Sequence, residues 1–218
     1  MMNIAIDGPA GAGKSTIAKL VAKKLDYIYV DTGAMYRAIA YYLLNNGIDV
    51  EDSAVLSEAV KSIQISIQYE NGMQQVYLNG ENVTAHLRTE VVGNMASVSS
   101  AKPEVRAALL ELQRELARNN NVVMDGRDIG TNILPDAQVK IYLTASSRER
   151  ATRRYKELLE KGENADLDKI EADIIDRDNR DMNREIAPLK QAEDAVYIDS
   201  SDMSIEEVVD NIISCVNA

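Results

Sequence analysis

The sequence predicts an α/β fold with a mostly parallel sheet of about five strands and helices on both faces. Three observations support this prediction. Short apolar runs typical of buried strands alternate with longer stretches whose apolar residues recur at helical spacing. A glycine-rich loop stands between the first such strand and the first such helix. One stretch of alternating apolar and polar residues interrupts the βα pattern and predicts a small antiparallel insertion.

The first predicted strand covers residues 3–7 and the first predicted helix covers 16–25. The loop between them reads GPAGAGKS, which fits the pattern G-x-x-x-x-G-K-S. Its glycines permit backbone conformations in which several N–H groups converge on one phosphate, and the helix adds the positive end of its dipole. We therefore expect a nucleoside triphosphate to bind at Gly8, Pro9, Ala10, Gly11, Ala12, Gly13, Lys14, Ser15 and Thr16.

Two side chains of this loop carry chemistry. Lys14 would supply a positive charge to the β- and γ-phosphates, and the Ser15 hydroxyl can ligate Mg²⁺. Asp125 ends an apolar strand predicted at 121–125, where a carboxylate can hold the metal or its waters. Acids also end strands for structural reasons, so the assignment of Asp125 depends on the loop. The expected cofactor is Mg²⁺, bound with the nucleotide.

The pattern continues along the chain. A strand at 27–30 precedes a helix at 34–45 that ends at Asn46-Gly47, and Asp52 caps a further helix through residue 60. Residues 63–69 alternate in polarity, Asn71-Gly72 is a hairpin turn signal, and residues 75–78 return as the second strand. Helices are expected at 87–100 and 103–119.

Strands are also expected at 139–143 and 196–199. The chain between 146 and 184 should be helical in two pieces broken at Gly162, and it carries more than half of the arginines. A closing helix at 204–216 begins with a capping box formed by Ser204 and Glu207.

Composition narrows the functional class. The formal net charge of −11 argues against a general nucleic-acid or membrane-surface binder. Cys215 is the single cysteine, which excludes an internal disulfide and a cysteine-built zinc site. His86, the single histidine, stands in a polar turn and is expected at the surface, so a His-dependent nucleophile triad has little support. The sequence shows neither a signal-peptide pattern nor 18 consecutive apolar residues, and we expect a cytoplasmic protein.

Charged residues gather at the predicted carboxyl ends of two strands, the edge where ligands bind in open parallel sheets. Thr32 and Arg37 follow the second strand and could reach an anionic group, or they could be a helix cap and a surface arginine. Arg127 and Asp128 lie in the turn that follows Asp125.

A further basic cluster lies in the predicted helix after residue 146. Arg150 and Arg154 are spaced i, i+4 and share one helix face. They could face phosphates, or they could belong to a solvated charged face.

Four blocks of the sequence resemble the signature of the bacterial-type cytidylate (CMP) kinases. They are the phosphate loop, DTGAMYR at 31–37, DGRDIGT at 125–131 and RDNRDMNR at 177–184. The stretches 94–97 and 105–106 and the hairpin insertion are also similar to that family, so the resemblance runs nearly end to end. Many kinases share the phosphate loop, whereas the combination of the second and third blocks is narrower. Arg148 lies outside the family's lid pattern, which begins at Arg150.

The resemblance implies a role for each matching residue. It places the acceptor monophosphate on Thr32, Arg37 and Arg127. It assigns the reading of the cytosine ring to Ser97, Arg106, Asp128 and Arg184. It assigns contacts with the sugar to Arg177 and Asp181, and closure over ATP to Arg150, Arg153 and Arg154. The implied catalytic residues are Lys14, Arg127, Arg150 and Arg154.

The resemblance also implies a P-loop NTPase fold in a single kinase domain over 1–218, with an acceptor-binding insertion at about 60–100 and a lid at about 146–165. The implied reaction moves the γ-phosphoryl group of Mg·ATP to CMP and dCMP in pyrimidine nucleotide metabolism. We expect a monomer without nucleic-acid or membrane partners.

Two alternatives stay open. One is a P-loop kinase for another small acceptor, such as UMP or another nucleoside monophosphate. The other is a nucleotide-dependent switch or binding module. The sequence argues against this second alternative, because it lacks both the N-K-x-D guanine motif of GTPase switches and the L-S-G-G motif of ABC-type ATPases.

Overall fold

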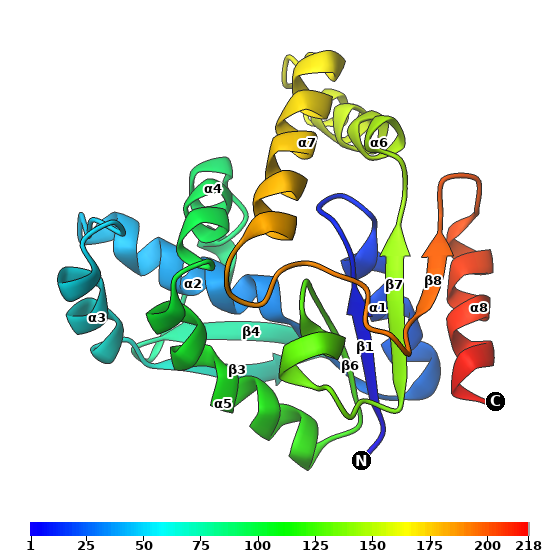
Figure 1. The fold of residues 1–218 in the computed structure, drawn as a ribbon, viewed down its shortest axis with the longest axis horizontal. Coiled ribbons are helices and arrows are strands. Elements are labelled where there is room, and N and C mark those ends of the chain that lie inside the picture. Colours follow the sequence, from blue (N-terminus) through cyan, green and yellow to red (C-terminus); the bar gives the residue numbers. More distant parts are fainter. Residues whose placement is uncertain (218) are drawn as a thin grey trace. The chain divides into compact units, whose positions relative to one another are not determined.

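The computed structural model describes residues 1–217 and contains two sheets (Figure 1). A five-stranded sheet has the order β2-β6-β1-β7-β8, and a three-stranded sheet has the order β3-β4-β5. The chain divides into two compact units. Unit 1 comprises Met1 and Ile28–Val122, and unit 2 comprises Met2–Tyr27 and the chain from Val123 onward. The α/β class and the five-stranded sheet are as predicted, while the single-domain boundaries stay a prediction.

Unit 2 contains the strands β1 (Asn3–Asp7), β7 (Val139–Thr144) and β8 (Val196–Asp199), together with most of β6 (Val122–Gly126). β7 pairs in parallel with β1 and with β8, and Asp7 lies opposite Tyr142 in the register. Ile4 and Ile6 are fully buried, and β1 reads as a continuous apolar run, as expected for a strand covered on both faces.

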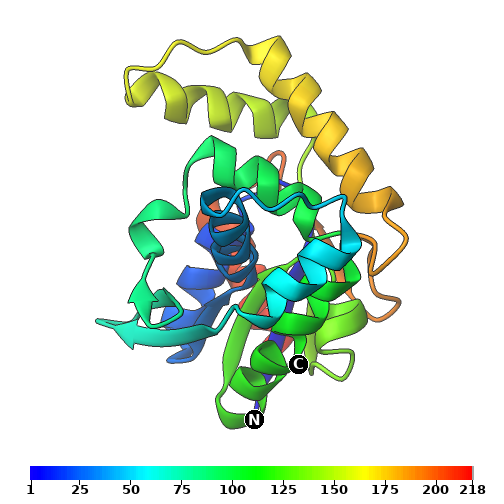
Figure 2. The ribbon, with the colours of Figure 1, turned by 90° about the vertical axis from the view of Figure 1, so that its left-hand side faces the viewer.

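The helices of unit 2 are α1 (Lys14–Leu25), α6 (Ser147–Glu160), α7 (Leu167–Asn183) and α8 (Ile205–Val216). Figure 2 shows α6 and α7 as the two arms of a helical hairpin. Gly162 lies between them with a φ of +76°, as the predicted break requires. The predicted capping box at Ser204 and Glu207 is confirmed. A short π-helical turn, η2 (Ile129–Ile133), follows β6 and was not predicted.

Unit 1 contains β2 (Ile28–Asp31), the helices α2 (Thr32–Asn45) and α3 (Ser53–Lys61), and the strands β3 (Ile65–Glu70), β4 (Met73–Leu78) and β5 (Glu81–Asn82). The predicted hairpin is confirmed, because β3 and β4 pair antiparallel around residues 71 and 72, whose φ angles of +51° and +74° suit a tight hairpin turn.

The remaining helices of unit 1 are η1 (Thr84–His86), α4 (Glu90–Ser99) and α5 (Pro103–Asn119). The helix predicted from residue 87 therefore begins later, with Thr89 as its N-cap. At the two ends of the unit, the Ile28 amide donates a hydrogen bond to the Asn121 carbonyl at 2.9 Å.

Hydrophobic packing holds the hairpin of unit 1 in place. Buried Val76 and Leu78 of β4 pack with Ala38 of α2, and Ile65 and Ile67 of β3 lie against the same cluster. Among the described residues, no helix has both the length and the apolar character needed to cross a membrane.

Candidate active site

The loop between β1 and α1 has a backbone that only a glycine-rich sequence can adopt. The φ angles of Gly8, Gly11 and Gly13 are +151°, +74° and +82°. A Cβ on Gly8 would lie 1.9 Å from the carbonyl oxygen of Leu143, so no side chain fits there. Because α1 begins directly after Gly13, the positive end of its dipole forms part of the loop. This conformation suits a bound phosphate.

Lys14 is buried within this loop. Its Nζ donates a hydrogen bond to the Pro9 carbonyl at 2.7 Å, and the side chain is 5% exposed. Burial lowers the pKa of Lys14, and the nearby positive charge of Arg127 lowers it further. A bound phosphate would supply the negative charge that favours the protonated form of this amine.

The structure brings together the two predicted metal ligands. The Ser15 hydroxyl at the start of α1 donates a hydrogen bond to Oδ2 of Asp125 at the end of β6, over 2.8 Å. A hydroxyl and a carboxylate are hard oxygen ligands of the kind that Mg²⁺ takes beside nucleotide phosphates and water. Residues 1–217 contain no cluster of three or more acidic, histidine or cysteine side chains that could hold a metal alone. A hydroxyl and a carboxylate therefore fit an ion whose other ligands are nucleotide phosphates and water.

The sequence analysis missed a second buried acid at the edge of the sheet. Asp7 ends β1, and its two carboxylate oxygens accept hydrogen bonds from the amides of Ile129 at 2.8 Å and Gly130 at 2.7 Å. Burial raises its pKa to about 6. Asp7 thus holds the turn that follows β6. The signal for it was an acid at the end of a fully apolar strand, the same signal that marked Asp125.

Two ion pairs connect this turn with the end of α7. Asp128 accepts from Arg184 at 3.0 Å, and Arg127 donates from its Nε to Asp181 at 2.8 Å. Burial alone would raise the pKa of Asp181, but the charge and the hydrogen bond of Arg127 hold it below its usual value. Arg177 and Arg184 add favourable electrostatic interactions with the same carboxylate, which links the two ion pairs. The five residues of unit 2 assigned to the acceptor by resemblance therefore form one network.

The three arginines expected in the lid differ in their surroundings. Arg154 is exposed and pairs with Glu157 at 3.3 Å, whereas Arg153 pairs with Glu149 at 3.2 Å and donates to the Ser200 carbonyl at 2.9 Å. Arg150 is buried at the base of α6. Although Arg150 and Arg154 are spaced i, i+4, the first is buried and the second is exposed.

In unit 1, two arginines share the carboxylate of Asp31. Arg37 and Arg88 approach its Oδ2 at 3.2 and 3.3 Å. Asp31 also caps α2 by accepting from the Ala34 amide at 2.8 Å, so the helix cap is Asp31 and not Thr32, which is the first residue of the helix. The sequence analysis missed both roles. Asp31 stands in a recognised block but was assigned no function there, and Arg88 stands outside every block.

The other two predicted residues of unit 1 lie on either side of Ser100. Arg106 donates to the Ser100 carbonyl at 3.3 Å, and its guanidinium lies 5.7 Å from the centre of the Tyr36 ring. Ser97 accepts at its carbonyl from the Ser100 hydroxyl, while its own buried Oγ has no hydrogen-bond partner within the described part of the chain. The Nε of Arg37 is also buried without a partner. Buried polar atoms with unused hydrogen-bonding capacity are consistent with a ligand site.

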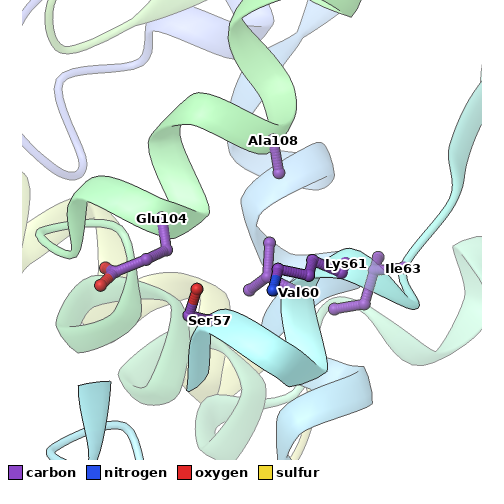
Figure 3. Close-up of a pocket in the computed structure, with 6 residues that line it drawn as sticks. All are labelled: Ser57, Val60, Lys61, Ile63, Glu104 and Ala108. Carbon is purple, nitrogen blue, oxygen red and sulfur yellow. The ribbon is translucent and has the colours of Figure 1, made fainter. Parts of the chain in front are cut away.

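A separate groove of about 380 Å³ lies between α3 and α5 of unit 1 (Figure 3) and contains none of the predicted site residues. It is lined by Ser57, Val60, Lys61, Ile63, Glu104 and Ala108. His86 is exposed, as predicted, and stacks on Tyr41 with ring centres 5.6 Å apart.

Comparisons with known proteins agree with the sequence motifs. A family model described as cytidylate kinase matches residues 4–218. Over 216 residues the chain is 49% identical to a cytidylate kinase of Bacillus cereus (strain ATCC 10987 / NRS 248) and 50% identical to one of Geobacillus sp. (strain WCH70). Each alignment covers 99% of this chain and 96% of the relative. A solved structure of an uncharacterized protein from Eubacterium ventriosum ATCC 27560 aligns with a TM-score of 0.55 at 13% identity, covering 100% of this chain and 99% of that one, which shows a shared fold.

Proposed function

Because the chain belongs to the cytidylate kinase family, we propose that it transfers the γ-phosphoryl group of Mg·ATP to CMP, and to dCMP, giving ADP and CDP or dCDP. The observation that carries this proposal is the hydrogen bond between Ser15 and Asp125 beside the buried ammonium of Lys14. A phosphate loop, a metal-binding hydroxyl and a strand-end carboxylate are the parts that bind and activate a nucleoside triphosphate.

On the donor side, the loop amides and the N-terminus of α1 would hold the phosphates. Lys14 would exchange its hydrogen bond with the Pro9 carbonyl for contacts with the β- and γ-phosphates. Ser15 and Asp125 would hold Mg²⁺, directly or through its waters. When bound, the ion would neutralise charge on the transferring group. Arg153 and Arg154 of α6 would add positive charge above the donor.

On the acceptor side, each unit contributes its own residues. In unit 2, Asp128 would accept from the N4 amino group of cytosine, and Arg184 would donate to a ring acceptor. Arg127 would bind the acceptor phosphate, while Arg177 and Asp181 would contact the sugar. In unit 1, Thr32 and Arg37 would bind the phosphate, and Ser97 and Arg106 would read the base.

This inventory suits phosphoryl transfer, which requires positioning and charge neutralisation more than covalent chemistry. The acceptor phosphate is already ionised at neutral pH, so the reaction does not depend on a general base.

The proposal is tested by ADP release in a coupled assay with CMP, dCMP, UMP, AMP and GMP, and without acceptor. We expect CMP and dCMP to give the highest kcat/KM, with one nucleoside diphosphate formed for each ADP. A preference for another acceptor, or equal ADP release without acceptor, would contradict the proposal. The cytoplasmic location, the monomeric state and the lack of nucleic-acid partners stay predictions, and light scattering after size-exclusion chromatography would test the monomer.

A further inference from the structure

Arg150 connects three segments of unit 2 at the base of the hairpin formed by α6 and α7. Its Nε donates to the Ala145 carbonyl, after β7, at 2.9 Å. Its Nη1 donates to the carbonyl of Ala10 in the phosphate loop at 2.9 Å and lies 2.7 Å from Oδ2 of Asp178 in α7. The side chains of Arg150 and Asp178 are 6% and 9% exposed.

The phosphate loop also packs directly on this arginine. A Cβ on Gly11 would lie 3.4 Å from the Cβ of Arg150, so the loop backbone rests on the side chain. Arg150 thus holds Ala10 by a hydrogen bond and Gly11 by contact. Both residues lie between Gly8 and Gly13, in the part of the loop that must present its amides to phosphate.

Asp178 supplies the charge that makes this arrangement possible. Two of the acceptors of Arg150 are neutral carbonyls, and a buried guanidinium requires a negative partner. The hydrogen bonds to Ala145 and Ala10, together with the ion pair, fix the orientation of the side chain. Among the arginines of α6, Arg154 by contrast is 44% exposed and has a surface partner.

We propose that Arg150 and Asp178 are a positioning pair that fixes the phosphate loop to the two helices of the hairpin. Arg150 then sets the affinity for ATP through the loop backbone, and it does not act on the transferring phosphate. This inference rests on the proposed function, because it takes the glycine loop as the ATP site. It also gives a role to Asp178, to which no contact with a nucleotide has been assigned.

The chain offers a matched control pair. Arg148 of α6 and Asp168 of α7 join the same two helices at 2.7 Å, with side chains 53% and 87% exposed. The partners of Arg148 are Asp168 and Glu171, both on α7, whereas Arg150 is bonded to the phosphate loop. Substitutions in the control pair therefore report on the link between the helices alone.

The experiment measures the equilibrium affinity for a nonhydrolysable ATP analogue with Mg²⁺, and separately for CMP, by isothermal titration calorimetry. The kcat with ATP and CMP and the Tm are measured for the same proteins. The variants are Arg150→Lys, Asp178→Asn, the double variant, and Arg148→Lys with Asp168→Asn as controls. We expect Arg150→Lys and Asp178→Asn each to reduce the affinity for the ATP analogue about tenfold, as substitutions of remote positioning residues do. The affinity for CMP should change less than twofold. Lysine keeps the charge but cannot reproduce the fork of hydrogen bonds. The double variant should be no weaker than the worse single variant, and the controls should match wild type.

Three results would overturn the proposal. Unchanged analogue affinity in both single variants is one. Another is a lower kcat in Arg150→Lys whose own analogue affinity is unchanged, because it would indicate direct action of Arg150 on the reaction. The third is an equal loss of analogue and CMP affinity with a lower Tm, which would indicate a purely structural pair. If Asp178→Asn does not fold, Arg150→Lys decides alone. Failure of the proposed function would appear instead as wild-type protein that releases no ADP with CMP, and the binding comparison needs no acceptor turnover.

Discussion

Oδ1 of Asp128 accepts a hydrogen bond from Nη2 of Arg184 at 3.0 Å, and both side chains are more than nine-tenths buried. The second oxygen of Asp128 accepts from the Asn132 side chain at 3.1 Å. The carboxylate is therefore held in one orientation by two side chains, and its ion-pair partner is Arg184 and not the adjacent Arg127. A carboxylate held in this way is suited to distinguish cytosine, which presents a donor at position 4, from uracil, which presents an acceptor there.

Asp128→Ala should reduce the preference for CMP over UMP. Cytosine presents an amino donor at N4, where uracil presents a carbonyl oxygen, so the carboxylate favours cytosine alone. One well-placed pair contributes about 1–3 kcal/mol of discrimination, and the ratio of the two kcat/KM values should fall by roughly ten- to a hundredfold. The measurement is kcat/KM for both nucleotides in both proteins. An unchanged ratio would mean that Asp128 does not read the base and serves only its contacts with Arg184 and Asn132.

Lys14→Ala should abolish most phosphoryl transfer. The ammonium is already desolvated and lies within the phosphate loop, so its charge acts strongly on the transferring group. We expect kcat to fall by at least about a hundredfold, which corresponds to roughly 3 kcal/mol. A thermal melt should show that the variant is folded. Near-normal turnover in the folded variant would show that the reaction does not require Lys14.

Arg154→Ala should lower the rate of transfer more than it weakens CMP binding. Its side chain is exposed, and among residues 1–217 its ion-pair partner is Glu157 alone, so it can turn toward a bound nucleotide. Arginines that stabilise phosphoryl transfer contribute about 10³–10⁵ in rate, and sharing the charge with Arg153 should reduce the loss below that range. Arg148→Ala on the same helix is the matched control and should leave kcat unchanged. Equal kinetics for the two variants would assign Arg154 to a solvated charged face.

Asp7 should make the free energy of unfolding depend on pH in an unusual direction. Its pKa in the folded protein is about 6, compared with 3.8 for an unperturbed aspartate. Between these values the folded state binds the extra proton, so this group's contribution to stability falls as the pH rises from about 4 to about 6. The Asp7→Asn variant has no such proton. Across this pH range the free energy of unfolding of the wild type should therefore fall by about 3 kcal/mol relative to that of the variant.

Urea unfolding of both proteins at pH 4, 5, 6 and 7, without nucleotide or metal, measures this change. Any constant cost of replacing one carboxylate oxygen by an amide shifts all four differences equally and does not alter the trend. A pH-independent difference between the two proteins would contradict the raised pKa.

Local sequence rules predicted most of the helices and strands. Some features depend only on residues close together in the sequence, so local patterns predict them. Examples are the apolar run of β1, the Asn71-Gly72 turn and the capping box at Ser204. The turn after β6 is different. Its π-helical form depends on amides that donate to Asp7, more than a hundred residues earlier, and no local pattern reports that contact.

In the candidate site, too, some residues could be predicted from local sequence and others depend on distant contacts. Motif spacing predicted Lys14, Ser15 and Asp125 as site residues, and their proposed roles follow from the elements that carry them. Arg150 and Asp178 are 28 positions apart, and nothing in their spacing indicates a buried pair at 2.7 Å. Helical periodicity assigned Arg150 to the same face as Arg154, but burial depends on what packs against each turn of the helix, which a single helix does not reveal.

The bond from the Ile28 amide to the Asn121 carbonyl means that unit 1 begins and ends at one place. The chain between these two residues is continuous, and it carries Thr32, Arg37 and Ser97 together with Arg106. One uninterrupted stretch of coding sequence therefore encodes all the residues of unit 1 that we propose for acceptor recognition. Recombination at only two junctions, which meet in the folded chain, would replace that share as a cassette and leave the codons of the glycine loop untouched.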